Sequence, residues 1–432
     1  MTEQMNVPEL RFGEFEEQLF LRPFGDLVTD VTYGPRFNAD DYSVEGNVRT
    51  IRGTDMGNNG EIKYAQVPTA QLDEKTVSRH ELKHGDLVMI TTADCGVTSV
   101  YREQNIKHIC SAYAVKIELN RGADSTYFKY FFQTRKAQYE VSRFIRRATV
   151  SNLPGSDIKR IRQSPPTLPE QQKIASFLSK VDEKIGLLSE KKDKLTEYKK
   201  GVMQQLFNGK WHEQDGRLTF VPPTLRFKAD DGSEFPDWEE RSLSEVATLQ
   251  SGYAFSSDLF SQAGEMLITP KNFSKSGNAL FTKKNTKYTQ EKTDKKYLCK
   301  GGDLLLLLTD LTPDCRLLGK PVLLEGGTEV LLNQRIVKFN ITANELLKKS
   351  YIFQYFLTQK WNNRMRITAT GTTVRHSSNR IVLNTNLAMP CIGEQAKIAN
   401  FLSTIDKKIE LANSELNKAK EWKKGLLQQM FV

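Results

Sequence analysis

The segment that closes this chain is a second copy of a segment near its middle. Residues 170–207 and 394–431 align without a gap at a constant offset of 224 (394 − 170), and 20 of the 38 aligned positions are identical. A chain built from two copies of one unit can fold as an intramolecular pseudo-dimer with approximate two-fold symmetry. Duplex DNA has two-fold symmetry as well. The repeat therefore predicts a tandem fold and indicates a partner of matching symmetry.

Each copy is predicted to form one long helix. Between Glu170 and Phe207 there is no proline, and apolar residues recur at alternating spacings of four and three, as they do in a coiled coil. Gly201 and Gly425 each lower the helix propensity by about 1 kcal/mol relative to alanine, so we expect each helix to need the other as a partner. The residues expected to pair the helices are Ile174, Leu178, Val181 and Ile185 in the first copy and Ile398, Leu402, Ile405 and Ile409 in the second.

Two details of this apolar seam bear on how the helices pair. Lysines interrupt it at Lys192, Lys199 and Lys423. Leu188 of the first copy corresponds to Ala412 of the second, and this match of large with small favours pairing of unlike helices. At about 1.5 Å per residue, a helix of this length spans roughly 57 Å and is long enough to act as a spacer.

The repeat continues upstream with less similarity, which predicts two diverged domains of one plan. Residues 8–12 (Pro-Glu-Leu-Arg-Phe) resemble residues 223–227 (Pro-Thr-Leu-Arg-Phe), and residues 83–87 resemble 300–304. Prolines precede each long helix, at Pro166 and Pro390. The expected organisation is a first domain over 1–165, a central helix over 166–210, a second domain over 211–389 and a distal helix over 390–432.

Each domain is predicted to be α+β. In the first domain, strands are expected over 48–51, 86–91 and 113–119, followed by a helix over 125–146. In the second, strands are expected over 303–309, 322–324 and 330–339, followed by a helix over 344–366. The fold class predicted is therefore α+β with two globular domains and two long helices in a pseudo-two-fold tandem repeat.

Composition favours an anionic partner and a reducing compartment. The net charge is +10 and the pI is about 9.1, which makes nucleic acid the leading partner class. Five cysteines, without a Cys-x-x-Cys pair, fit the cytoplasm. The apolar run from Leu304 to Leu308 is far shorter than the ~20 residues that span a bilayer, and no signal peptide is recognised. We expect a cytoplasmic protein without a membrane partner.

The sequence provides no positive indication of catalysis. It contains neither the Gly-x-x-x-x-Gly-Lys-Ser/Thr loop that binds nucleotide phosphates nor the Gly-x-Gly-x-x-Gly dinucleotide motif. His80 and His84 have helical metal-pair spacing, but no third ligand is nearby, so a surface pair is the better interpretation and no metal site is predicted. Asp86, Asp303 and Asp310 are interpreted as turn residues and not as nuclease carboxylates.

Candidate DNA-binding residues form two kinds of cluster. Basic residues late in each domain suit phosphate contacts that fix the register of the protein on DNA, although any one of them is almost as well explained as a solvated surface residue. The phosphate-contact candidates are Arg143, Arg146, Arg147, Arg366, Arg375 and Arg380. Arginine can read guanine, and asparagine or glutamine can read adenine. The base-readout candidates and their neighbours are Arg49, Arg52, Thr54, Asp55, Lys271, Asn272, Gln334 and Arg335.

The doubled motif resembles a known family. The pattern Pro-x-x-x-Glu-Gln-x-Lys-Ile-Ala-x-Phe-Leu-Ser-x-Ile/Val-Asp, closed by Lys-Lys-Gly-x-x-Gln-Gln-x-Phe and present twice, is similar to that of the specificity subunits of type I restriction-modification systems. Residues 166–207 match the family's central conserved region and 390–431 its distal one. Residues 370–374 (Thr-Gly-Thr-Thr-Val) resemble the end of a target-recognition domain, whereas the first copy has Arg147-Ala148-Thr149-Val150 there.

The resemblance implies a non-catalytic DNA reader. Two target-recognition domains would each bind half of a split target in double-stranded DNA, separated by an antiparallel coiled coil of the two conserved helices. Two methyltransferase subunits and two restriction subunits would join the chain. S-adenosylmethionine, ATP and magnesium are expected on those partners, with no cofactor in this chain.

Two other functions remain open at this stage. One is a coiled-coil assembly scaffold whose positive charge is unrelated to DNA. The other is a nuclease or methyltransferase with fused recognition domains. Salt-dependent duplex binding would argue against the scaffold, and methylation or cleavage by the isolated chain would favour the enzyme.

Overall fold

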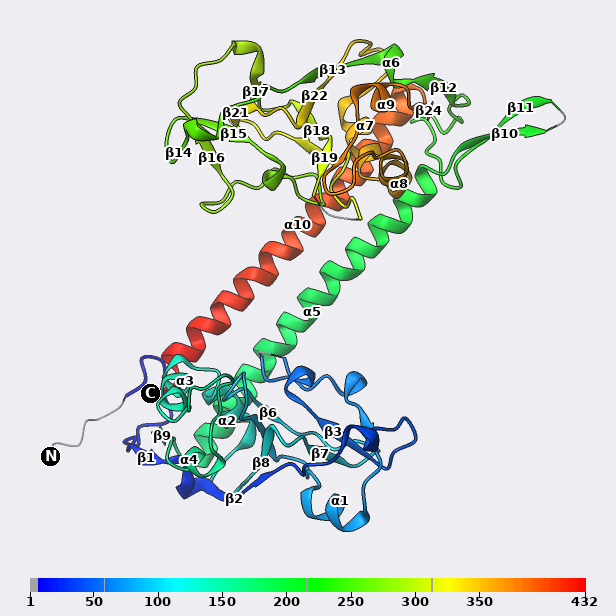
Figure 1. Ribbon diagram of the computed structural model, residues 1–432. Helices are drawn as coiled ribbons and strands as arrows, with labels where there is room; N and C mark the ends of the chain where they lie inside the picture. Colours follow the sequence, from blue (N-terminus) through cyan, green and yellow to red (C-terminus); the bar gives the residue numbers. More distant parts are fainter. Residues whose placement is uncertain (1–6, 58, 215, 312–313) are drawn as a thin grey trace. The chain divides into compact units, whose positions relative to one another are not determined.

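The chain divides into two compact units that share two long helices. The computed structural model describes residues 7–57, 59–214, 216–311 and 314–432. The first unit comprises Met1–Glu190 with Asn413–Val432, and the second comprises Lys191–Ala412. The chain leaves the first unit along α5 (Leu168–Leu206, 39 residues) and returns from the second along α10 (Ile392–Gln429, 38 residues) (Figure 1). The two long helices of the tandem repeat are confirmed, and they pair antiparallel.

The described part of the first unit contains a four-stranded sheet, a three-stranded sheet and the two-stranded sheet β1-β9, packed beside short helices. Its strands are β1 (Arg22–Pro23), β2 (Val28–Tyr33), β3 (Val48–Ile51), β4 (Thr69–Ala70), β5 (Leu87–Ile90), β6 (Thr98–Val100), β7 (His108–Cys110), β8 (Ala114–Leu119) and β9 (Arg162–Gln163). Its short helices are α1 (Glu74–His80), α2 (Ser125–Phe131), α3 (Arg135–Ser142) and α4 (Gly155–Ile158). The order β2-β8-β5-β6 forms an antiparallel sheet, and β4-β3-β7 forms a second sheet in which β3 and β7 are parallel.

The second unit repeats this plan with additions. Its strands are β10 (Lys210–Gln214), β11 (Arg217–Val221), β12 (Glu239–Ser242), β13 (Ala247–Ser251), β14 (Phe260–Ser261), β15 (Glu265–Ile268), β16 (Lys287–Thr289), β17 (Leu298–Lys300), β18 (Leu304–Leu307), β19 (Thr309–Asp310), β20 (Pro321–Leu323), β21 (Glu329–Leu332), β22 (Ile336–Ile341), β23 (Arg375–His376) and β24 (Asn386–Met389). Its short helices are α6 (Leu243–Val246), α7 (Lys349–Phe356), α8 (Gln359–Ile367) and α9 (Asn379–Leu383). The antiparallel order β13-β22-β18-β20 matches β2-β8-β5-β6, and the parallel pair β15/β21 matches β3/β7.

Two expected helices and two expected strands are interrupted. The strand predicted over 303–309 is wrong, because it divides into β18 and β19, which belong to different sheets. The single helix predicted over 125–146 is wrong, because α2 ends at Phe131 and Thr134 caps α3 by accepting a hydrogen bond from the Ala137 backbone N–H at 3.1 Å. The helix predicted over 344–366 is split in the same way, where Thr358 caps α8. The single strand predicted over 330–339 is also wrong. It consists of β21 and β22, which belong to different sheets and are joined by a turn at Asn333.

The ends of both long helices are part of the domain cores. In the first unit, Ile174, Leu178 and Val181 are buried in one cluster with aromatic residues of α2, with Leu426 of α10 and with Phe431, which follows α10. Burial of such a side chain contributes about 1.5–3 kcal/mol. A helix with little intrinsic stability is therefore fixed by tertiary packing on its domain as well as by its partner helix.

The second unit buries its helix ends in the same manner. Ile398, Leu402 and Ile405 of α10 lie in the core cluster that contains Val202 and Leu206 of α5. Ile185 and Ile409, one turn further from the domains, are only partly buried and pack at the edges of these clusters.

Two of the three lysines that interrupt the apolar seam are paired with aspartates of the facing helix, whereas Lys192 pairs with Asp193 of its own helix. In the first unit, Lys423 Nζ lies 2.7 Å from Asp182, which also accepts a 2.8 Å hydrogen bond from Tyr130 Oη. In the second unit, Lys199 Nζ lies 2.6 Å from Asp406, which accepts a 3.0 Å hydrogen bond from the Gln354 amide. These ion pairs occupy equivalent positions of the repeat, because Asp182 and Asp406 are 224 residues apart.

Among the described residues, no helix is both long and apolar enough to cross a membrane.

Candidate nucleic-acid interface

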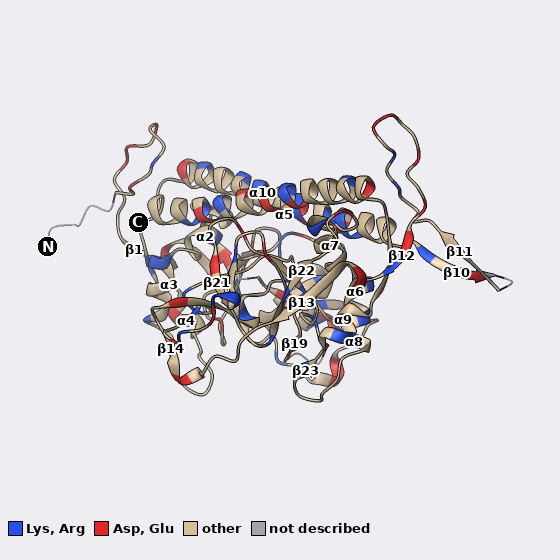
Figure 2. Ribbon diagram, turned by 90° about the horizontal axis from the view of Figure 1, so that it is seen from above, with Lys and Arg blue, Asp and Glu red and all other residues tan. Residues whose placement is uncertain are grey.

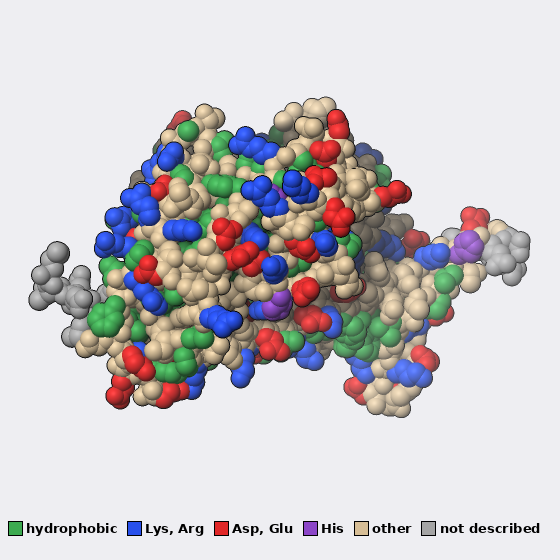
Figure 3. All heavy atoms as spheres, turned by 90° about the horizontal axis from the view of Figure 1, so that it is seen from below, with side chains coloured by type: hydrophobic (Ala, Val, Ile, Leu, Met, Phe, Trp, Pro, Cys, Tyr) green, Lys and Arg blue, Asp and Glu red, His purple; other side chains and the backbone are tan. Residues whose placement is uncertain are grey.

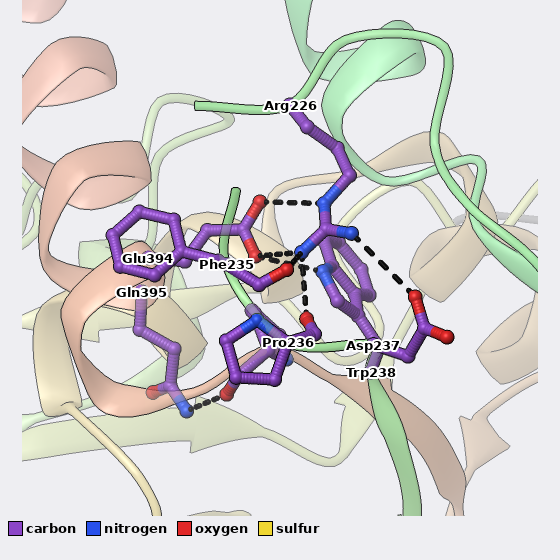
Figure 4. Close-up of polar contacts among 8 residues, drawn as sticks. Arg226, Phe235, Pro236, Asp237, Trp238, Glu394 and Gln395 are labelled. Carbon is purple, nitrogen blue, oxygen red and sulfur yellow. Dashed lines mark hydrogen bonds and ion pairs between the residues drawn. The ribbon is translucent and has the colours of Figure 1, made fainter. Parts of the chain in front are cut away.

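Each domain is fastened to a long helix by a buried glutamate. In the second unit, Glu394 at the start of α10 is fully buried and accepts two hydrogen bonds from Arg226, from Nε at 3.1 Å and from Nη2 at 2.8 Å (Figure 4). Trp238 Nε1 donates a third at 3.0 Å. The hydrogen bonds to Glu394 raise the pKa of Arg226 above its ordinary value. Arg226 also donates to the carbonyls of Phe235 and Pro236, so the segment before β12 is wrapped around the helix start.

The first unit has the same contact at equivalent positions. Glu170 of α5 accepts hydrogen bonds from Arg11 Nε at 2.8 Å and from Nη2 at 2.7 Å. The Leu10 backbone N–H donates to the Gln429 carbonyl of α10 at 3.0 Å. The segment 8–12 therefore connects the start of one long helix with the end of the other, which explains its resemblance to 223–227. We use the term clasp for the Arg11–Glu170 and Arg226–Glu394 contacts.

The glutamine that follows each clasp glutamate fixes the domain helix. Gln171 accepts a 2.9 Å hydrogen bond from the backbone N–H of Asp124, the N-cap of α2, and donates to the Pro166 carbonyl at 2.9 Å. Gln395 does the same in the second unit, accepting from the backbone N–H of Lys348, the N-cap of α7, at 2.8 Å. The Glu-Gln pair of the repeated motif thus attaches two separate chain segments to one helix start.

Three turns of the first unit lie next to one another. We define them as the capping turn (52–55), the central turn (111–113) and the return loop (146–152). The Ser111 backbone N–H donates to the Ile51 carbonyl at 2.9 Å, which places the central turn beside the capping turn. The Thr91 backbone N–H donates to the Tyr113 carbonyl at 3.0 Å, and Thr92 pairs with Asn152 of the return loop.

The second unit brings together the equivalent three turns: a capping turn (269–272), a central turn (333–335) and a return loop (370–376). Ile268, which precedes the capping turn, pairs with Leu332, which precedes the central turn. The Leu308 backbone N–H donates to the Arg335 carbonyl at 3.1 Å, and Thr309 pairs with His376 of the return loop. The surfaces therefore have the same backbone frame and different side chains.

In each capping turn, a buried acidic or amide side chain forms hydrogen bonds to neighbouring residues of the same unit. Asp55 is fully buried and accepts two 3.0 Å hydrogen bonds from the Arg52 guanidinium, whose side chain is 42% exposed. These bonds raise the pKa of Arg52 above its ordinary value. Asn272 is fully buried, accepts from the Thr269 backbone N–H at 2.8 Å and donates to the Leu280 carbonyl at 2.9 Å. Asp55 and Asn272 therefore hold the turns and do not present their polar atoms to solvent.

The return loops differ at one backbone position. Gly371 has φ +92, and a Cβ there would lie 2.2 Å from the Val374 carbonyl oxygen, so the loop requires glycine. The first copy has Arg147 at this position, without a positive φ. Both loops nevertheless close with paired backbone hydrogen bonds, Arg146 with Asn152 and Thr370 with His376.

The remaining predicted DNA-binding residues differ in how far their side chains are buried. Arg49 is half-buried and donates to the Tyr64 carbonyl at 3.1 Å, and Arg375 is half-buried and donates to the Gly371 carbonyl at 2.8 Å. Arg143 is exposed but forms an ion pair with Glu140 at 2.8 Å. The exposed candidates are Thr54, Arg146, Arg147, Lys271, Gln334, Arg335, Arg366 and Arg380.

Two residues of these surfaces were not predicted from the sequence. Tyr113, 65% exposed, stands in the central turn at the position that Arg335 has in the second unit. His376 of the second return loop is exposed and pairs with Thr309. Residues 110–114 and 332–336 share no identical position at the offset of 222 that the strand register sets, so no sequence signal identifies Tyr113 as the counterpart of Arg335.

Basic and acidic residues are intermixed in both Figure 2 and Figure 3. Basic and acidic residues alternate along α5 and α10 in Figure 2. On the face drawn in Figure 3, lysine and arginine side chains are spread out with acidic side chains between them. In the part of the chain that the structure describes, no group of three or more His, Cys, Asp and Glu residues could hold a metal ion.

Comparison with known proteins identifies the architecture. The structure resembles the S subunit of the type I restriction-modification system from M. genitalium, with a TM-score of 0.57 at 15% identity over 99% of both chains. It also resembles a chain from a structure titled for complex assembly and conformational transition of the type I R-M system, with a TM-score of 0.55 at 14% identity, covering 94% of this chain and 96% of that one. These likenesses concern the fold.

The sequence comparisons agree with the fold. The specificity subunit of the type I restriction enzyme MjaVIII from Methanocaldococcus jannaschii is 27% identical over 336 residues, which are 76% of this chain and 74% of that one. The family model described as the type I restriction modification DNA specificity domain matches residues 23–197 and 236–421, one match in each half of the repeat. With both halves matched, this chain belongs to the family of type I restriction-modification DNA specificity subunits.

Proposed function

We propose that this chain is the non-catalytic DNA reader of a type I restriction-modification complex and that it binds a bipartite target, one half-site per domain. The observation that carries the proposal is the pair of equivalent three-turn surfaces, which share a backbone frame and differ in their exposed side chains. Two copies of one frame suit two segments of duplex DNA, and different side chains suit different base sequences. The net charge of +10 suits contact with phosphates.

The long helices are proposed to carry the methyltransferase subunits. Large apolar side chains remain exposed at repeat-related positions: Leu187 and Leu411 are each 60% exposed, and Tyr198 and Trp422 are 54% and 49% exposed. In the first unit, Trp422 lines a hollow of about 430 Å³ together with Leu188 and Ala419. Apolar side chains beside such a hollow favour a protein partner. Two related positions agree with two methyltransferase subunits, to which two restriction subunits would be added.

The cofactors of the reaction are assigned to those partners. We propose that S-adenosylmethionine, ATP and magnesium bind the methyltransferase and restriction subunits and that this chain binds none of them.

A cytoplasmic location is proposed as well, where a reducing environment keeps thiols free: Cys95, Cys110, Cys299 and Cys315 are buried and unpaired with one another.

The test of a bipartite target is the distance between the half-sites. One heptad inserted after Glu190 and one after Ala412 preserves the phase of the helix pair and lengthens it by about 10 Å. At about 3.4 Å per base pair, the preferred spacer should then grow by roughly three base pairs while both half-site sequences stay unchanged. Methylation of a library of spacer lengths by an active insertion variant measures this. An active variant that keeps the original spacer would contradict the proposal.

The assembly proposal has its own test. Replacing Ile185 and Ile409 together by aspartate puts carboxylates into the edges of both apolar clusters and should separate the helices. Co-purification with the methyltransferase subunit should then be lost. Retention of the partner and of target binding in this double variant would argue that the helix pair is not the platform.

A further inference from the structure

The central turns have the same rigid backbone in both units. In the first, the Ala114 backbone N–H donates to the Ser111 carbonyl at 3.0 Å, and in the second the Ile336 backbone N–H donates to the Asn333 carbonyl at 2.9 Å. Each turn also connects two sheets, since β7 and β8 flank the first and β21 and β22 flank the second. A turn held by two sheets presents its side chains in fixed directions.

A glycine from a neighbouring segment approaches each central turn closely. A Cβ on Gly34 would lie 1.9 Å from the Cys110 carbonyl oxygen, and a Cβ on Gly252 would lie 2.1 Å from the Asn333 carbonyl oxygen. No side chain fits at either position. The close approach is therefore a repeated element of the frame, and the sequence differences between the turns concern the side chains they expose.

These exposed side chains differ in chemistry. The first central turn presents Tyr113, an aromatic residue that is 65% exposed. The second presents Gln334 and Arg335, both exposed. A large aromatic side chain held away from any core contributes little to folding, whereas it offers a broad apolar contact to a ligand. Glutamine and arginine offer paired hydrogen-bond groups in a planar arrangement.

The second central turn borders an open polar cleft. Gln334 and Arg335 line a cleft of about 310 Å³ together with Ser251, Ser377 and Asn379. Ser377 Oγ is buried and has no hydrogen-bond partner among the described residues. Asn379 donates to Ser251 Oγ at 3.0 Å, which leaves its side-chain carbonyl available as an acceptor. The cleft thus gathers hydrogen-bonding groups of both kinds beside the turn.

In the first unit a tyrosine occupies the equivalent place. The strand register pairs Tyr33 with Val115 and Ser251 with Val337, so Tyr33 is the counterpart of Ser251. Tyr33 Oη accepts a 2.6 Å hydrogen bond from the Gly155 backbone N–H. A Cβ on Gly155 would lie 2.9 Å from the Tyr33 ring, so the ring fills the space beside Gly155 that a side chain would otherwise take.

We propose that the central turns determine the sequence difference between the two half-sites. Gln334 and Arg335, beside the open cleft, would bind purine edges through paired hydrogen bonds, glutamine to adenine and arginine to guanine. Tyr113, beside the filled position, would make apolar contact with a thymine methyl group or with a base face. This inference rests on the proposed function, in which each domain binds one half-site.

The experiment maps methylation by the full chain assembled with its methyltransferase subunit, on duplexes randomised within each half-site. Arg335→Ala should relax discrimination at one position of one half-site by about 5- to 150-fold, with the other half-site unchanged. Tyr113→Ala should relax only the other half-site. Arg335→Lys keeps the charge but lacks the bidentate geometry, and should relax the same position as Arg335→Ala.

The control is Arg121→Ala, which removes an exposed arginine from the turn between β8 and α2, outside the candidate interface, and should leave the sequence preference unchanged. Thermal unfolding of each variant separates a specificity change from loss of the fold. Unchanged preference in Arg335→Ala, or equal weakening on target and random duplexes, would overturn the inference. So would recovery of wild-type preference by Arg335→Lys. Failure of the proposed function itself would be seen differently, as wild-type complex that methylates no split target.

Discussion

The two units of this chain agree in the contacts that hold their domains to the long helices and differ in the side chains on their three-turn surfaces. Arg11 and Glu170 form the same ion pair as Arg226 and Glu394, whereas Tyr113 stands where the second unit has Arg335. A buried carboxylate tolerates few replacements, because removing its partner leaves a charge without water. An exposed side chain on a fixed turn can change freely. The comparison teaches that the residues that hold the frame are separate from the exposed residues that differ between the two surfaces.

The clasps themselves are not identical. Glu394 accepts hydrogen bonds from Arg226 and from Trp238 Nε1. In the described residues, the side-chain hydrogen bonds to Glu170 come from Arg11 alone. The second clasp therefore retains one donor when its arginine is removed, and the first does not.

The largest expected effect is loss of a clasp arginine. Arg11→Ala and Arg226→Ala each leave a buried carboxylate without its cation and should lower the free energy of unfolding by about 3–5 kcal/mol. Arg11→Ala should have the greater effect, because Trp238 still donates to Glu394 in Arg226→Ala. Chemical denaturation measures both. The control is Trp238→Phe combined with Arg226→Ala, which should remove the difference, and losses below about 1 kcal/mol would contradict the role of the clasps.

The next effect concerns the seam ion pairs. Asp182→Ala and Asp406→Ala remove the acceptor of Lys423 and Lys199, and each should lower the free energy of unfolding by about 1.5–3 kcal/mol. A double-mutant cycle of Asp406→Ala with Lys199→Met isolates the pair energy. The double variant should be more stable than Asp406→Ala alone, because methionine needs no counter-charge. A coupling energy near zero would mean that the lysine is solvated by other groups.

A third comparison tests the two proposed half-sites through the capping turns. Arg52→Ala should relax recognition in one half-site and Lys271→Ala in the other, by about 1–3 kcal/mol if each contacts a base. Competition binding between target and random duplexes, over a range of salt, measures this. Equal losses on both duplexes, with a salt slope lower by about one, would instead assign the residue to a phosphate contact.

The smallest expected effect lies in the return loops. Gly371→Ala forces a side chain into a left-handed conformation and toward the Val374 carbonyl, and should lower the free energy of unfolding by about 1–2 kcal/mol. Arg147→Ala, at the equivalent position of the first loop, should change it by less than about 0.5 kcal/mol. Similar losses in the two variants would show that the loops do not differ in backbone requirement.

The sequence by itself determined the tandem repeat, the two long helices and the α+β class. Helix periodicity and strand patterning are local properties, so they can be recognised without knowledge of the partners. Strand 48–51 was predicted with its observed bounds. The helix over 125–146 was not, because the helix propensity of Thr134 does not by itself predict a break. Thr134 acts as an N-cap only where α2 and α3 pack as separate helices.

What only the tertiary structure decided is which distant residues share a surface and which polar side chains are already in use. Asp55 and Asn272 look like readout candidates in sequence, yet both are buried and hold their own turns. The Pro-x-Leu-Arg-Phe segments resemble each other in sequence, but their function as clasps depends on Glu170 and Glu394, more than 150 residues away. Tyr113 and Arg335 became equivalent only through strand register. The hydrogen-bond partners of a buried polar side chain often come from residues that are distant in the sequence. The type of a residue and its neighbours in the sequence therefore do not tell whether its polar atoms are already paired.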